Sequence, residues 1–136
     1  MDDDGLTVFI YIKGVSKPNP GPSAWGAVLR YKAINKEFGG KLEDMTSVRA
    51  EIEASMYAMD QLTRSCIVVI HSNLQFFVQK MANNTSTWTE KNGDLYAALE
   101  DYKRLHTIHW RWIKKGEHEA MNRANEIALG YLRGDK

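Results

Sequence analysis

The alternation of apolar and polar positions predicts three strands at the start of the chain. Thr7–Ile12 is apolar nearly throughout and rich in β-branched and aromatic residues, which is typical of a strand buried on both faces. A loop rich in Pro and Gly, residues 14–23, separates it from a second apolar strand, Trp25–Tyr31. A weaker third strand, Asn35–Lys41, follows a short turn, so the three segments fit an antiparallel meander.

The spacing then changes to that of a helix, and the two patterns alternate afterwards. Apolar residues three or four apart predict a helix that begins with Thr46 or Ser47 as its N-cap and ends near Arg64. The order β-β-β-α-β-α-α-β-α predicts an α/β fold with a five-stranded mixed sheet flanked by helices. The later segments are a strand over Ile67–Ile70 parallel to the first, a helix capped by Asn73, a helix over Leu95–Leu105, a strand over Thr107–Ile113 and a helix over about Ala120–Leu132.

The length and charge of the chain narrow the class of protein. The 136 residues suit one domain, which we expect over residues 6–136 after a disordered N-terminal tail over 1–5. The 18 Lys and Arg against 17 Asp and Glu argue against a strong, sequence-blind grip on nucleic acid, although one basic face remains compatible.

Cysteine content and hydropathy exclude further classes. Cys66 is the only cysteine, which excludes a disulfide framework and a cysteine zinc site. The N-terminal residues have no signal-peptide pattern, and no apolar run approaches the roughly 20 residues of a membrane helix. We therefore expect a cytoplasmic protein that does not bind a membrane.

Five local sequences then occur in an order that resembles the ribonuclease H type 1 (RNase HI) family. They are KPNPGPSAWGAVLRY, TSVRAEIEA, IVVIHSNLQFF, IHWRWIKKGEH and NRANEIA, and the match covers about Thr7 to Arg133. The resemblance implies the ribonuclease H-like fold and hydrolysis of the RNA strand of an RNA/DNA hybrid. It also implies two divalent ions, Mg²⁺ or Mn²⁺, held by carboxylates at the ends of the first and fourth strands and in the first and last helices.

The chain departs from this family at the four carboxylate positions. The resemblance places them at Lys13, Glu51, Asn73 and Asn125, and only Glu51 keeps a carboxylate. Two hard dications need negatively charged oxygen ligands, and the formal charge of the four side chains falls from about −4 to about 0. We therefore expect a degenerate active site with no catalytic residue and no metal cofactor, and a pseudoenzyme rather than an enzyme. His118 lies where the family has an assisting histidine, but the loop is shortened, which favours a solvent-exposed side chain.

Several of these residues admit a second interpretation. Lys13 either forms an ion pair with a buried Glu51 in place of a metal, or extends to solvent from the strand end. Glu51 also fits a first-turn helix charge, and Asn73 an ordinary N-cap. His71 fits a packed strand-end residue.

The resemblance also implies a groove that contacts RNA 2′-hydroxyls through short polar groups. The candidate nucleic-acid-binding residues are Lys13, Asn19, Gly21, Thr46, Ser47, Gln75 and Trp88. The C-terminal third offers either a basic surface or an ordinary solvated face, through Lys103, Arg104, Arg111, Lys114, Lys115, Arg123 and Arg133. The tryptophans Trp110 and Trp112 alternate with polar residues, so we expect them in the core.

Three functions remain open from the sequence. The favoured one is a catalytically inactive RNase H-like protein that binds nucleic acid, either an RNA/DNA hybrid or double-stranded RNA. The balanced charge instead favours a scaffolding subunit with a protein partner or a homodimer. The third is a residual RNA/DNA-hybrid ribonuclease, ranked last because one carboxylate is too few for two metals.

Overall fold

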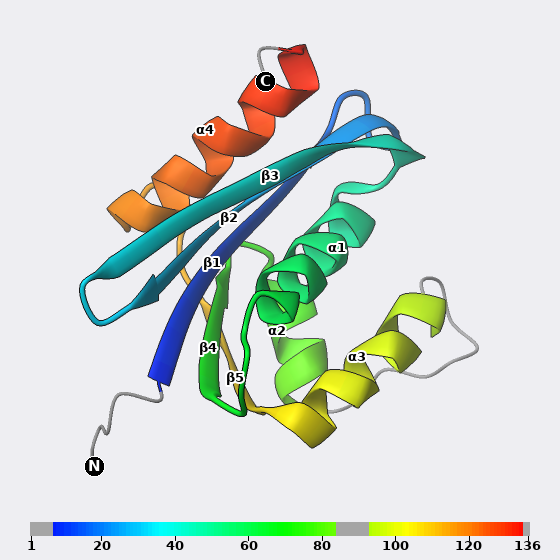
Figure 1. Cartoon of the computed structure of the whole chain (residues 1–136). Helices are drawn as coiled ribbons and strands as arrows, with labels where there is room; N and C mark the ends of the chain where they lie inside the picture. Colours follow the sequence, from blue (N-terminus) through cyan, green and yellow to red (C-terminus); the bar gives the residue numbers. More distant parts are fainter. Residues whose placement is uncertain (1–6, 84–92, 135–136) are drawn as a thin grey trace.

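The computed structural model describes residues 7–83 and 93–134, and its elements follow the predicted order (Figure 1). The strands are β1 (Thr7–Ser16), β2 (Gly21–Tyr31), β3 (Ile34–Met45), β4 (Ile67–Ser72) and β5 (Thr107–Trp112). The helices are α1 (Ser47–Asp60), α2 (Gln75–Ala82), α3 (Gly93–Leu105) and α4 (Glu119–Arg133). The expected tail over 1–5 and Trp88 lie outside the described residues, so the domain limits stay a prediction.

One mixed sheet with the order β3-β2-β1-β4-β5 organises the molecule. The pairs β1–β2 and β2–β3 are antiparallel, whereas β4 is parallel to both β1 and β5. Helices α1, α2 and α3 cover one face of the sheet and α4 covers the other (Figure 1). No helix in the described segments is long and apolar enough to cross a membrane.

The side-chain alternation of β1 divides the core between these two layers. Val8, Ile10 and Ile12 pack with the buried residues of α1, whereas Tyr11 packs with those of α4. Because β1 is central and covered on both faces, both sets of positions are apolar. This explains the nearly continuous apolar run that the sequence shows there.

Several element limits differ from those predicted. The 14–23 loop is shorter than expected, because β1 continues through Ser16 and β2 begins at Gly21. The hydroxyl groups of Ser16 and Ser23 lie 2.6 Å apart, and Ser16 Oγ donates to the Met45 carbonyl 2.9 Å away, so short side-chain contacts extend the sheet. Helix α1 ends at Asp60 and does not extend to Arg64.

Two glycines allow the helices to approach the sheet closely. A Cβ atom on Gly14 would lie 2.5 Å from the Ser47 carbonyl oxygen and 2.7 Å from the Glu51 nitrogen, both backbone atoms of α1. A Cβ atom on Gly26 would likewise collide with the Ala124 carbonyl oxygen of α4. Both positions need glycine for space and not for backbone conformation.

The substitution Gly14→Ala tests this packing. We expect it to lower the free energy of unfolding by about 2–3 kcal/mol, because α1 must move away from β1. The control is Gly116→Ala, where nothing lies within 4 Å of the added carbon and only the left-handed φ of 83° is strained, at a cost of about 1 kcal/mol. Urea denaturation measures both variants, and equal losses would contradict the close-approach argument.

Candidate functional site

The parallel strands β1 and β4 bring Lys13 and Asn73 together. Tyr11 of β1 pairs in register with His71 of β4, so the two strands end at the same edge of the sheet. Lys13 Nζ donates to Asn73 Oδ1 at 3.3 Å, and Asn73 Nδ2 donates to the Ile113 carbonyl at 2.8 Å. Asn73 therefore holds the lysine and also joins the end of β4 to the residue that follows β5.

The carboxyl group of Glu51 is fully buried between α1, β1 and β4. Its Oε1 accepts from Ser72 Oγ at 2.5 Å, and its Oε2 accepts from the Gly14 backbone nitrogen at 3.2 Å. Burial raises the pKa of Glu51 to about 7, although the two hydrogen bonds and the charge of Lys13 act in the opposite direction. The alternative that Glu51 is a first-turn helix charge is wrong, because the first turn of α1 holds no acidic residue.

The direct ion pair expected between Lys13 and Glu51 is not formed. Residue 13 has the same parity as Tyr11 and so belongs to the α4 side of the sheet, whereas Glu51 lies on the α1 side. Lys13 does not simply extend to solvent either, because it is half-buried and bonded to Asn73. Burial lowers the pKa of Lys13, the charge of Glu51 raises it, and the charge of Lys115 lowers it.

The fourth position, Asn125, comes to the same edge on α4. Gly26 pairs in register with Lys13, and α4 crosses the sheet at Gly26 with the backbone of Ala124 and Ala128. Asn125 lies half-buried on that turn of the helix. The four positions named by the resemblance are thus brought to one end of the sheet.

These residues do not fit a pair of divalent cations. The one carboxyl group is buried and has both oxygens occupied by hydrogen bonds, and the charge of Lys13 acts on it from the other side of the sheet. Within residues 7–83 and 93–134, no group of three or more His, Cys, Asp and Glu side chains is placed to hold a metal. Mg²⁺ and Mn²⁺ prefer charged oxygen ligands, which this set does not supply.

His118 is a structural residue of α4, and the expectation that it is solvent-exposed is wrong. Its Nδ1 accepts from the Ala120 backbone nitrogen at 3.0 Å and so caps the helix. Its ring stacks on Tyr11 with the centroids 4.7 Å apart, and His71 stacks on Tyr11 at 4.3 Å. His71 is buried and its Nδ1 bonds to the Ile10 carbonyl, which confirms it as a packed strand-end residue.

A polar surface lies beside this edge, where the first loop meets α1. Asn19 Nδ2 donates to Ser47 Oγ at 3.2 Å, and the Ser47 backbone nitrogen donates to Asn19 Oδ1 at 3.2 Å. Thr46 caps α1 by accepting from the Arg49 nitrogen, as predicted. Gly21 closes the loop, because a Cβ atom there would lie 2.5 Å from the Pro18 carbonyl oxygen.

The start of α2 differs from the prediction. Leu74, and not Asn73, is the N-cap, and no side chain caps the helix there. Ser72 Oγ accepts from the Leu74 backbone nitrogen at 3.0 Å, which leaves the Asn73 side chain for Lys13 and Ile113. Gln75 begins α2 as an exposed residue next to this cluster.

Ion pairs neutralise much of the predicted basic surface. Lys103, Arg104 and Arg123 pair with Glu100, Asp101 and Glu37 respectively. The alternative of an ordinary solvated face therefore holds for these three residues. Lys115 remains as a positive charge close enough to affect Lys13.

Sequence reasoning missed Trp112, which was expected in the core. Its side chain is 46% exposed, because it is the last residue of an edge strand, and its Nε1 donates to the Asn73 carbonyl at 3.0 Å. The other expected core tryptophan, Trp110, does pack, in an edge-to-face contact with Phe77. The signal for Trp112 is its place at the end of the strand, two residues before the polar segment 114–117.

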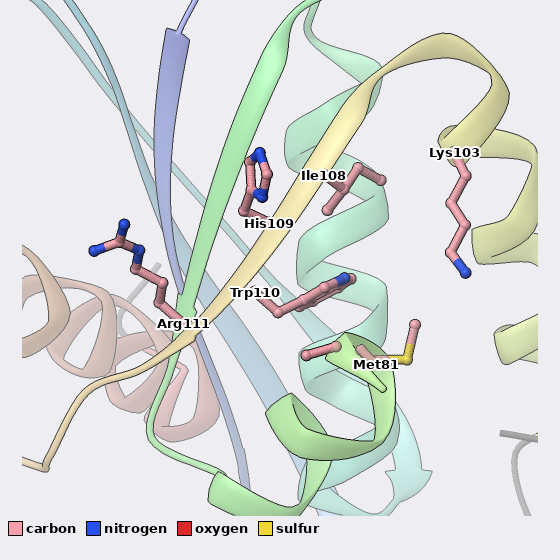
Figure 2. Close-up of a pocket in the computed structure, with 7 residues that line it drawn as sticks. Met81, Lys103, Ile108, His109, Trp110 and Arg111 are labelled. Carbon is pink, nitrogen blue, oxygen red and sulfur yellow. The ribbon is translucent and has the colours of Figure 1, made fainter. Parts of the chain in front are cut away.

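A separate hollow of about 530 Å³ lies along β5, away from the strand ends (Figure 2). Trp110 and Ile108 line it on the side of α2, where Met81 projects, and Lys103 reaches toward it from α3. His109 and Arg111 project from the opposite side of the strand. The hollow therefore shares no lining residue with the Lys13 cluster.

Comparison with known proteins identifies the family of the chain. A family model for RNase H matches residues 6–129. The chain belongs to the RNase H family. Ribonuclease H of Paramagnetospirillum magneticum is 34% identical over 134 residues, which span 90% of this chain and 87% of that protein. Ribonuclease H of Hahella chejuensis is 36% identical over 135 residues, which span 90% of each. These matches are consistent with the type 1 family.

Solved structures confirm the ribonuclease H-like fold. LC11-RNase H1 in complex with an RNA/DNA hybrid gives a TM-score of 0.80 at 20% identity, over 94% of this chain and 98% of that one. The N-terminal RNase H domain from Mycobacterium tuberculosis, as a fusion with maltose-binding protein, gives 0.81 at 18% identity, over 95% of each.

The comparisons correct the expectation that the chain is not an enzyme. The relatives are named Ribonuclease H, which is an enzyme, so the family evidence contradicts the pseudoenzyme interpretation. The side chains at the four positions differ from four carboxylates. This difference does not by itself show that activity is lost. The chemistry at this edge therefore depends on the side chains that are present there, Lys13, Glu51, Asn73 and Asn125.

The substitution Glu51→Gln tests the burial of this carboxyl group. The folded-state pKa of about 7 lies above the ordinary 4.5, so the folded state binds the extra proton between these values. The resulting stability is present below pH 4.5 and is lost as the pH rises toward 7. Relative to the wild type, the variant should therefore gain about 2–3 kcal/mol of unfolding free energy between pH 5 and pH 8.

Denaturant unfolding of both proteins at the two pH values measures this gain. The comparison with the wild type removes the pH dependence of all other groups. A difference between the two proteins that is the same at both pH values would show that Glu51 is not held neutral.

Proposed function

We propose that this RNase H family protein binds RNA-containing duplexes, above all an RNA/DNA hybrid. The binding surface consists of the first loop with Asn19 and Gly21, the start of α1 with Thr46 and Ser47, and the start of α2 with Gln75. RNA is distinguished from DNA through its 2′-hydroxyl groups, which need short polar donors and acceptors at fixed positions.

The observation that carries this proposal is the pair of hydrogen bonds between Asn19 and Ser47. It joins two segments 28 residues apart into one polar surface beside the strand ends. A fixed surface loses little conformational freedom on binding, which favours affinity. The hybrid in the LC11-RNase H1 structure, and the foamy viral protease-reverse transcriptase in complex with RNA/DNA hybrid, support the choice of ligand.

Binding without a metal pair belongs to the same proposal. The family's carboxylates face phosphates and need dications between them. Lys13, Asn73 and Asn125 remove that negative charge, so a duplex can approach this edge without ions. Hydrolysis of the RNA strand is a separate property, and the relatives are named Ribonuclease H for it. It is measured by the length of the RNA after incubation with the protein.

Metal binding gives one prediction. We expect about 10 mM Mg²⁺ to leave the melting temperature of the wild type unchanged, because a ligand stabilises a protein only by binding its folded state. The combined variant Lys13→Asp, Asn73→Asp and Asn125→Asp should instead melt at a higher temperature with Mg²⁺ than without it. Scanning calorimetry measures both, and an equal rise in the wild type would contradict the absence of a metal pair.

The Asn19 surface gives another prediction. Fluorescence anisotropy in EDTA, with a labelled hybrid and double-stranded DNA, double-stranded RNA and single strands as competitors, should show a preference for RNA-containing duplexes. Asn19→Ala should weaken hybrid binding by about 5- to 10-fold, because it removes both hydrogen bonds to Ser47.

Asn35→Ala is the matched control for this variant. Asn35 also accepts a side-chain hydrogen bond, from Arg30 Nε at 2.8 Å. It belongs to β3 and pairs with Arg30 near the end of β2 that is farther from the Asn19 surface. Its removal should leave hybrid affinity unchanged. Equal affinity of the wild type for the hybrid and for double-stranded DNA would contradict the proposed function, and the expected protein partner or homodimer would then be sought.

A further inference from the structure

The charges at the strand ends leave Lys13 without a direct acidic partner. Among the residues that the structure describes, no carboxylate forms an ion pair with Lys13, and its one hydrogen bond goes to the neutral Asn73 amide. The nearest acidic influence is Glu51, whose oxygens are taken by Ser72 and Gly14. The ammonium group is thus fixed in position and only partly neutralised.

A second lysine, Lys115, lies near enough for its charge to act on Lys13. Lys115 lies on the loop between β5 and α4. Burial is the main cause of the lowered pKa of Lys13, the charge of Glu51 acts against it, and the charge of Lys115 makes the smallest contribution of the three. Lys115 is exposed. An anion bound next to Lys13 would also be attracted by the charge of Lys115.

The start of α2 contributes in the same direction. The helix begins two residues after Asn73, no side chain caps it, and its first turn holds no acidic residue. The amino end of a helix carries partial positive charge and favours anions. Lys13, Lys115 and this helix end therefore produce a positive potential at one edge of the sheet.

We propose that Lys13, together with the amino end of α2 and with Lys115 on the neighbouring loop, forms a subsite for one phosphodiester group of a bound nucleic acid. The inference rests on the proposed function and concerns how this site binds the phosphate backbone of the nucleic acid. Asn73 is the positioning residue, because it accepts from Lys13 and is itself anchored to Ile113. The contact needs no divalent ion.

The first test is hybrid binding across a salt series, in EDTA and in Mg²⁺. Mg²⁺ should not raise the affinity above that in EDTA, and as a competing cation it should lower it. Lys13→Met should lower it about tenfold and reduce the slope of log affinity against log salt by about 0.9, the change expected for one phosphate contact. Lys13→Arg should restore most of the affinity, because it keeps the charge and the donors.

Lys36→Met is the matched control. Lys36 is an exposed strand lysine that pairs with Leu29 at the far end of β2, whereas Lys13 pairs with Gly26. It should change neither the affinity nor the slope. A second measurement uses the wild type alone: the NMR signal of the Lys13 side-chain ammonium should shift on addition of the hybrid.

The outcomes separate the two proposals. If the hybrid binds but Lys13→Met behaves as Lys36→Met does and the ammonium signal does not move, the phosphate subsite is wrong and the proposed function stands. A requirement for Mg²⁺ in hybrid binding would also overturn the subsite. No binding of any RNA-containing duplex by the wild type at low salt would overturn the proposed function, and the subsite with it.

Discussion

The buried carboxyl group of Glu51 is the contact on which this end of the molecule depends. It receives hydrogen bonds from the end of β4, through Ser72, and from the backbone of β1, at Gly14. These bonds require α1 to lie directly against β1, which the absence of a side chain at Gly14 allows. A buried polar group without such partners would be costly, so the three elements can meet in few other ways.

This arrangement also determines the electrostatics of the neighbouring surface. Glu51 lies on the α1 side of the sheet and its two oxygens accept from Ser72 and Gly14, so it does not neutralise Lys13 by direct contact on the other side of β1. A glutamate at a position that binds metal in the family can therefore be held in the fold by its hydrogen bonds to the protein. Retention of this glutamate is weak evidence for metal binding, whereas the residues at the other three positions bear directly on it.

The sequence predicted the architecture well because its signals were local. The apolar run of β1 and the periodicity of α1 gave the order of elements, and the resemblance gave four positions that the structure does bring together. The partners within the site were not predictable in the same way. Whether Lys13 bonds to Glu51 or to Asn73 depends on which side of the sheet each occupies, and for Lys13 this follows from the side-chain alternation of β1.

Misassigned side chains had similar causes. Trp112 has the same alternation as Trp110, but only the fold shows that it ends an edge strand and so loses its covering layer. Asn is a residue type that favours the N-cap position, but here the Ser72 hydroxyl accepts from the Leu74 backbone nitrogen. The Asn73 side-chain amide is therefore available for other hydrogen bonds. The sequence predicts an exposed loop position for His118, whereas in the fold its ring stacks on Tyr11.

The hydrogen bonds around Asn73 have a consequence for the affinity of recognition. Its amide donates to the Ile113 carbonyl, and its carbonyl accepts from the Trp112 indole, so the ends of β4 and β5 behave as one rigid unit. The loop that carries Lys115 starts from this unit. Asn73 also holds Lys13, so part of the entropy of positioning its ammonium group is lost during folding, and an incoming anion finds this group nearly in place, as in a preorganised receptor.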